Sequence, residues 1–180
     1  MRILLNASTI QKGGALQTSA ALMGEILRDA RGIEWHFAVS RVLFEELRAF
    51  GLDVGNFGLQ IFEQSPTRDR EAARALSQME KEMRPDAVFT PSGPAYVKFS
   101  TPHLLGCSEP WVTHAGASTL RTYGSLVRMA ELLLLVAYKG HWFRHADRWV
   151  TQTADSRLGL SRRWDIPQGN RIISRTIPVG

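Results

Sequence analysis

The sequence has little cysteine and no long apolar segment, and each absence excludes a class of protein. Its single cysteine, Cys107, cannot form an internal disulfide, and a thiolate zinc site would need further cysteines. The most apolar stretch, residues 129–138, falls well short of the roughly 20 residues that cross a bilayer, so it indicates a core or interface helix. The apolar run at residues 3–5 is too short for a secretory signal. We therefore expect a cytoplasmic protein in which Cys107 is a small buried residue.

Several catalytic and binding motifs are also missing. The sequence contains no G-x-G-x-x-G fingerprint for a dinucleotide, no Walker phosphate loop, no G-x-S-x-G nucleophile elbow and no H-E-x-x-H zinc motif. His141 and His145 lie one helical turn apart, which is compatible with zinc. Because no third, acidic ligand stands at that spacing, a surface or interfacial role is favoured. We expect no bound metal and no cofactor.

The overall composition is that of an ordinary globular protein, with 44% hydrophobic and 22% charged residues, but the charge is unevenly distributed. Residues 1–120 hold 12 Lys and Arg against 13 Asp and Glu, whereas residues 121–180 hold 10 against 4. This basic last third also carries Trp142, Trp149 and Trp164, a combination that suits an anionic membrane surface or a phosphate-bearing partner. A solvated basic helix face is the alternative. We expect no nucleic-acid partner.

Hydrophobic periodicity alternates between strand-like and helix-like segments along the chain. The predicted strands are residues 3–5, 35–39, 59–62, 87–89, 103–105, 111–113, 149–151 and 171–177. The predicted helices are residues 15–28, 42–50, 67–83, 120–145 and 155–164. Since parallel strands need crossover connections, this alternation predicts a single α/β domain over residues 1–180, with a Rossmann-like parallel β-sheet and helices on both faces.

The order of strand, glycine loop and helix at the N-terminus is the first indication of a binding site. Gly13 and Gly14 stand between the first predicted strand and the first predicted helix. Glycine lets backbone come close to a ligand, and the N–H groups and dipole of the following helix attract anions. The pattern predicts a phosphate or carboxylate site, with an ordinary loop before a surface helix as the alternative.

Four loops follow predicted strands, at the edge where parallel sheets bind their ligands. They are residues 6–14, 90–94, 107–110 and 114–118. In these loops His114 offers a hydrogen bond to a sugar hydroxyl or a phosphate oxygen, and Glu109 a carboxylate that orients a hydroxyl. Ser92 and Gly93 offer a hydroxyl and a closely approaching backbone. The corresponding structural alternatives are a satisfied histidine, an exposed loop carboxylate and a plain turn.

A series of segments gives the chain a family resemblance. It begins with M-R-I-L-L-N-A-S at residues 1–8 and G-G-A-L-Q at residues 13–17, and continues with D-A-V-F-T-P-S-G-P at residues 86–94. P-H-L-L-G, P-W-V-T-H, R-W-V-T-Q-T and S-R-R-W-D-I-P follow at residues 102–106, 110–114, 148–153 and 161–167. In this order and spacing they resemble the N-terminal domain of glycosyltransferase family 4 enzymes, which have the GT-B fold. The resemblance covers essentially the whole chain, although each motif alone is loose.

The resemblance implies a hexosyltransferase-type enzyme that moves a sugar from a nucleotide-sugar donor to a glycan, lipid-linked or small-molecule acceptor without a bound metal. In that family this domain mainly holds the acceptor, and its glycine loop approaches the donor phosphates. On this basis His114 is the expected catalytic residue. The expected substrate and donor-phosphate ligands are Asn6, Gly13, Gly14, Gln17, Ser92, Gly93 and Glu109.

The sequence departs from the family at its end. The family's second domain, which supplies most nucleotide contacts and a paired-glutamate motif, is not in these residues, and residues 174–180 lack the asparagine often found beside the proline there. We therefore expect a domain that is inactive without a C-terminal donor domain. A stand-alone Rossmann-type nucleotide or phosphate module and a membrane-surface domain are the alternatives. The cleft side of a lone domain should be unusually apolar, so a homodimer through it is expected, as is a peripheral location at the inner membrane face.

Overall fold

The computed structural model describes residues 1–55, 57–107, 109–116, 122, 125–164, 166 and 172–174. The strands are β1 (Arg2–Ala7), β2 (Glu34–Ser40), β3 (Gly58–Phe62), β4 (Ala87–Thr90), β5 (His103–Cys107), β6 (Arg148–Thr151) and β7 (Ile172–Ser174). The helices are α1 (Gly14–Arg28), α2 (Arg41–Ala49), α3 (Arg70–Met83), α4 (Pro110–His114), α6 (Leu126–Phe143) and α7 (Ala154–Trp164).

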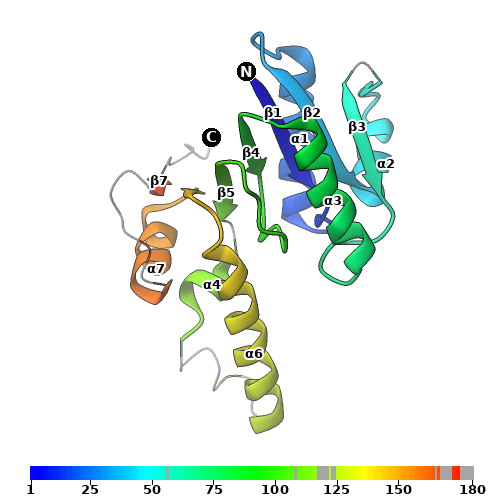
Figure 1. Cartoon of the computed structure of the whole chain (residues 1–180). Helices are drawn as coiled ribbons and strands as arrows, with labels where there is room; N and C mark the ends of the chain where they lie inside the picture. Colours follow the sequence, from blue (N-terminus) through cyan, green and yellow to red (C-terminus); the bar gives the residue numbers. More distant parts are fainter. Residues whose placement is uncertain are drawn as a thin grey trace.

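The described strands form one parallel sheet in the order β3-β2-β1-β4-β5-β6-β7 (Figure 1), so the predicted Rossmann-like fold is confirmed. The chain builds outward from β1 in one direction and from β4 in the other. Leu5 of β1 therefore pairs with Phe37 of β2 on one side and with Phe89 of β4 on the other. In sheets of this kind the ligand crevice lies outside the carboxyl ends of the two strands where the order reverses, here β1 and β4.

The alternation of side chains along the strands places apolar residues on both faces of the sheet. On one face Leu5 and Phe37 pack with α1 and α2. On the other face Leu4 packs with Leu76 of α3, and a separate cluster around Leu105 joins β5 and β6 to α4, α6 and α7. Because helices cover both faces, the strands are nearly continuous apolar runs, as in other buried parallel sheets.

The structure corrects one predicted element and several boundaries. Residues 111–113, expected as a strand, belong to α4, because Pro110 stands at the first helical turn, where its missing N–H costs nothing. The helix expected from residue 67 begins at Arg70, since the Asp69 carboxylate caps it by accepting a hydrogen bond from the Glu71 N–H at 2.7 Å. The helix expected over 120–145 is α6, and residues 120, 121, 123 and 124 lie outside the described residues. The last predicted strand, residues 171–177, is described only as β7.

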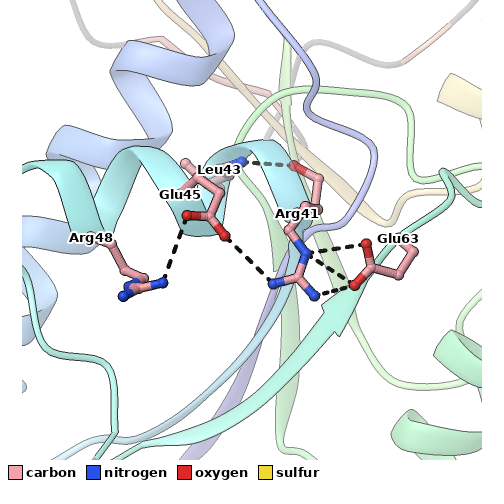
Figure 2. A network of polar contacts seen from close by, with 6 residues as sticks. Arg41, Leu43, Glu45, Arg48 and Glu63 are labelled. Atoms are coloured by element: carbon pink, nitrogen blue, oxygen red, sulfur yellow. Dashed lines mark hydrogen bonds and ion pairs between the residues drawn. The ribbon is translucent and has the colours of Figure 1, made fainter.

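An ion-pair network joins the start of α2 to the chain just after β3 (Figure 2). Arg41 Nε lies 3.0 and 3.1 Å from the two carboxylate oxygens of Glu63. Glu45 adds contacts of 3.6 Å to Arg41 and 3.8 Å to Arg48. The hydrogen bonds from Arg41 lower the pKa of the Glu63 carboxyl. Because these side chains are exposed, water and salt screen the network, and it adds little to stability.

Candidate functional site

A chain of buried polar side chains connects β1, β4 and β5 beside the point where the strand order reverses. Asn6 Nδ2 donates to Thr90 Oγ1 at 3.3 Å, and Thr90 Oγ1 lies 2.9 Å from His103 Nε2. Asn6 Oδ1 accepts hydrogen bonds from the Ser8 N–H at 3.3 Å and from the Ser8 hydroxyl at 2.7 Å. These four side chains are almost completely buried, so their hydrogen bonds fix the arrangement of the strands and of the loop that follows β1.

His103 is neutral in this network. Burial lowers the pKa of its imidazole to about 4, against the weaker opposing effect of Asp147 and Glu80. Thr90 Oγ1 accepts from Asn6 and lies within hydrogen-bond distance of His103 Nε2, so this one ring nitrogen ties the neutral imidazole to the network. Nδ1 has no hydrogen-bond partner among the described residues. His103 is thus a buried member of the network that links the strands.

The loop after β1 ends at Gly13, a position where any other residue would strain the backbone. Gly13 has φ +72° and ψ −160°, a backbone conformation essentially restricted to glycine, and it is the N-cap of α1. The first turn of α1 has no acidic side chain and its N-cap makes no side-chain hydrogen bond. The N–H groups and positive dipole end of α1 are therefore uncompensated by any cap or acidic side chain of that turn.

Ser40 holds this loop against the neighbouring strand. Its fully buried hydroxyl donates to the carbonyl of Ile10 and accepts from the Leu43 N–H at 3.1 Å, so one side chain caps α2 and ties down the loop. The Ile10 N–H in turn donates to the carbonyl of Ala7 at 3.2 Å. Contacts with Ala7 of β1 and with Ser40 at the end of β2 thus set the position of the loop.

The loop after β4 folds back over β5. The Gly93 N–H donates to the Gly106 carbonyl at 3.3 Å. A Cβ at Gly106 would collide with the backbone of Pro91, so glycine at this position allows the two segments to cross in contact. This crossing brings Ser92 and Gly93 toward the loop that follows β1.

These loops surround a cavity of about 260 Å³ at the carboxyl edge of the sheet. It is lined by residues 9–12, Ala15, Thr67, residues 92–94, Tyr96, Glu109 and Lys139. Lys139 Nζ lies 2.7 Å from Glu109 Oε2, and both side chains are mostly buried, with 18% and 28% of their surface exposed. A polar cavity of this size holds a sugar ring or a phosphate rather than a whole nucleotide sugar, so it fits one part of a larger ligand.

Tyr96 forms one wall of this cavity and keeps its proton. Burial raises the pKa of its phenol to about 12, so the hydroxyl is a hydrogen-bond donor at neutral pH. Its ring stacks on Tyr138 with centroids 5.7 Å apart and lies 6.2 Å from Trp142. Its φ of 57° is rare for a residue other than glycine. The aromatic contacts with α6 hold Tyr96 in this conformation.

Six of the eight predicted site residues lie in the cavity, beside it or in the polar network next to it. Ser92, Gly93 and Glu109 line the cavity, and Gly13 and Gly14 stand between Lys12 and Ala15, which also line it. Asn6 is buried beneath it in the polar network. Their roles as ligands stay predictions.

The other two predicted residues lie elsewhere. His114 is exposed and lines a separate hollow of about 510 Å³ between α4 and α7, together with Arg162 and Arg163. Gln17 lines an apolar hollow with Phe50 on the outer side of α1. The structure thus does not gather all the predicted residues in one cavity.

Sequence reasoning missed several residues of this site. Thr90 was contained in a candidate loop but was not singled out, and His103 was assigned only to a strand. Ser40 stands at the end of a predicted strand directly before a predicted helix, a position typical of an N-cap. Lys139 could have been found as a lone cation near the end of an apolar helix stretch. Tyr96 carried no such indication.

Two classes of feature are not found in the part of the chain that the structure describes. No group of three or more His, Cys, Asp or Glu side chains is placed to hold a metal ion there. Within the same residues, no helix is both long enough and apolar enough to span a bilayer.

Comparison with known proteins places the fold in a known group. No family model and no curated protein matches the chain. Among solved structures, it is similar to MurG from Acinetobacter baumannii, with a TM-score of 0.53 and 11% identity over 100% of this chain and 46% of that one. It is also similar to UDP-GlcNAc 2-epimerase from Neisseria meningitidis bound to UDP-GlcNAc (TM-score 0.54, 14% identity, 97% and 45% covered). The epimerase from Methanocaldococcus jannaschii gives a TM-score of 0.52 at 12% identity, with 97% and 45% covered.

These similarities establish a Rossmann-like domain of the GT-B type. The chain spans less than half the length of each of these proteins. At identities this low, the shared feature is the fold, and function has to be argued from the site itself.

Proposed function

We propose that this chain is the acceptor-side domain of a glycosyltransferase similar to family 4, which transfers a sugar from a nucleotide-sugar donor and depends on a second domain for most nucleotide contacts. The observation that supports this most is the uncapped amino end of α1 beside the cavity. It combines a helix start that no side chain caps, a glycine-only turn at Gly13 and the cation of Lys12 at the edge where such sheets bind ligands.

In this proposal the chain's own residues divide the work. The amino end of α1 and the ammonium of Lys12 stabilise the negative charge that develops on the leaving phosphate. Ser92 and the Tyr96 hydroxyl hydrogen-bond the acceptor, and Lys139 positions the Glu109 carboxylate toward an acceptor hydroxyl. His114 contacts the transferring sugar from the second hollow.

A titration of the ¹⁵N-labelled chain with UDP-GlcNAc, followed by NMR, tests this division. Because the cavity fits only part of a nucleotide sugar, we expect weak binding, with a Kd on the order of 1 mM, and shifts at the amides of Gly13, Gly14 and Gly93. Lys12→Ala should weaken binding several-fold, whereas the exposed Lys81→Ala on α3, away from the cavity, should not. Binding with a Kd near 1 μM or tighter, or shifts confined to other residues, would contradict the proposal.

The two epimerases among the similar structures favour a second candidate, the corresponding half of a sugar-nucleotide epimerase. A transferase holds two substrates, whereas an epimerase holds one. Saturation-transfer NMR with a panel of mono- and disaccharides, in the presence of excess UDP-GlcNAc, separates the two. A second sugar that still binds, and whose signal is lost in Ser92→Ala, supports the transferase. Competition by UDP-GlcNAc against every sugar in the panel supports the epimerase.

A further inference from the structure

Helix α6 leaves most of its apolar side chains in water. Its buried residues, Val136, Gly140 and Phe143, lie in the C-terminal half, and the N-terminal half projects away from the sheet (Figure 1). Six large apolar side chains of this helix are exposed: Leu126 81%, Val127 68%, Leu133 46%, Leu134 71%, Leu135 44% and Tyr138 44%. Exposed large apolar side chains gathered on one helix are typical of an interaction surface, so α6 has a surface suited to a partner.

The exposed side of α6 has a regular pattern. Val127, Ala130, Leu134, Ala137 and His141 follow one another at alternating spacings of three and four residues, and all five are exposed. We call these five residues the α6 stripe. This spacing is that of the seam along which one helix packs on another. The stripe therefore points to a helix as the partner.

We propose that the α6 stripe is a homodimer interface in which the α6 helices of two copies pack antiparallel. In an antiparallel pair, with the two-fold axis between residues 135 and 136, Leu134 of each copy faces Ala137 of the other, and Ala130 faces His141. At these four positions a large side chain meets a small one, which lets two identical helices interlock. Val127 faces Arg144 at the far end of the other helix, so the self-complementary part of the stripe runs from Ala130 to His141.

The charges on α6 favour this partner over a lipid surface. A membrane-surface helix presents several cations along its polar face. The charged residues of α6 are Arg128, Glu131 and Lys139, and Lys139 is already paired with Glu109. In the antiparallel pair Glu131 lies one turn or less from Tyr138 and His141 of the other copy, both of which offer hydrogen bonds. The inference is independent of the proposed function.

Sedimentation equilibrium over a wide concentration range tests the interface. We expect a concentration-dependent dimer whose Kd rises about tenfold or more in Leu134→Lys, since this change buries a charge at the centre of the seam. The matched control is Leu135→Lys, one residue away and 44% exposed but outside the stripe, which should change Kd by less than about twofold. Circular dichroism checks that both variants are folded. A wild-type chain that is monomeric at every concentration would overturn the proposal.

Single cysteines then test the antiparallel arrangement. The native Cys107 does not interfere, because it is 2% exposed and burial raises the pKa of its thiol to about 12. Ala137→Cys lies near the two-fold axis and should cross-link the dimer on oxidation. Val127→Cys should not, because its two copies lie on the order of 25 Å apart along the helix axis. Equal cross-linking of both variants contradicts the arrangement. Binding of a monomer to phosphatidylglycerol vesicles, lost in Leu134→Lys, would assign the stripe to a membrane instead.

Discussion

The half of the sheet formed by β1 to β4 and the helix α6 differ in how completely their side chains are buried. In the β1–β4 half even the polar side chains Asn6 and Thr90 are fully buried and hydrogen-bonded to each other. In α6 the apolar Leu134 is 71% exposed. The first region is complete within this chain, whereas the second has a surface suited to a further contact.

The difference follows from where each element lies relative to the sheet. Strands β1 and β4 are central, so helices cover them on both faces and the polar network between them is shielded from water. The fully buried residues of α6 all lie in its C-terminal half, from Val136 onward. A rigid, buried region positions the candidate site, and an exposed helix beside it is available for assembly.

Matched truncations in the two regions should give the largest contrast. Phe37→Ala removes a fully buried ring from the β1–β4 half and should lower the free energy of unfolding by about 3–5 kcal/mol. Leu134→Ala removes an exposed side chain and should change it by about 0.5 kcal/mol or less when measured on the monomer. Urea denaturation at low protein concentration measures both. Equal losses would show that α6 is packed more tightly within the monomer than its exposure indicates.

The sequence was sufficient for the fold because periodicity and loops carry that information locally. The alternation of apolar runs predicted the parallel sheet, and residues such as Leu4 and Leu5, which face opposite sides, explain why no strand looked amphipathic. It misassigned residues 111–113 because an aromatic and two β-branched residues favour a strand, whereas Pro110 starts a helix there. Local propensity was overridden by that turn.

The candidate site was only partly predictable from the sequence, since its geometry depends on contacts between distant segments. The loops after β1 and β4 could be predicted from their glycines and their order. The network of Asn6, Thr90 and His103 could not, because it joins positions up to 97 residues apart through the pairing of three strands. His114 was predicted from its loop position and from the resemblance, but the structure places it in another hollow.

The pH dependence of stability provides a test of the buried network, with an effect of intermediate size. The pKa of His103 is about 4 in the folded chain and its ordinary value is 6.5, so below pH 6.5 the unfolded chain binds more protons. Stability is therefore retained above pH 6.5 and falls as the pH is lowered from 6.5 to 4. We expect His103 to contribute a loss of roughly 2–3 kcal/mol over this range, measured by urea denaturation.

The variant His103→Gln isolates this contribution from that of the carboxylates. Its amide offers a hydrogen-bonding group to Thr90 but takes up no proton in this range. The difference in stability between pH 7 and pH 4.5 should therefore be smaller in the variant than in the wild type. An identical difference in both proteins would mean that His103 is not buried in its neutral form.

The smallest effect, and the one closest to the candidate site, concerns the two adjacent glycines. Gly13→Ala forces a Cβ into a backbone conformation that essentially only glycine adopts, so it should cost about 1–3 kcal/mol of stability and weaken UDP-GlcNAc binding. Gly14 has a helical conformation and open space where its Cβ would lie, so Gly14→Ala should leave stability unchanged or slightly higher. Thermal unfolding and the NMR titration measure both effects. If Gly14→Ala abolished binding while the fold was intact, the ligand itself would occupy that open space, and the contact would extend from Gly13 into the first turn of α1.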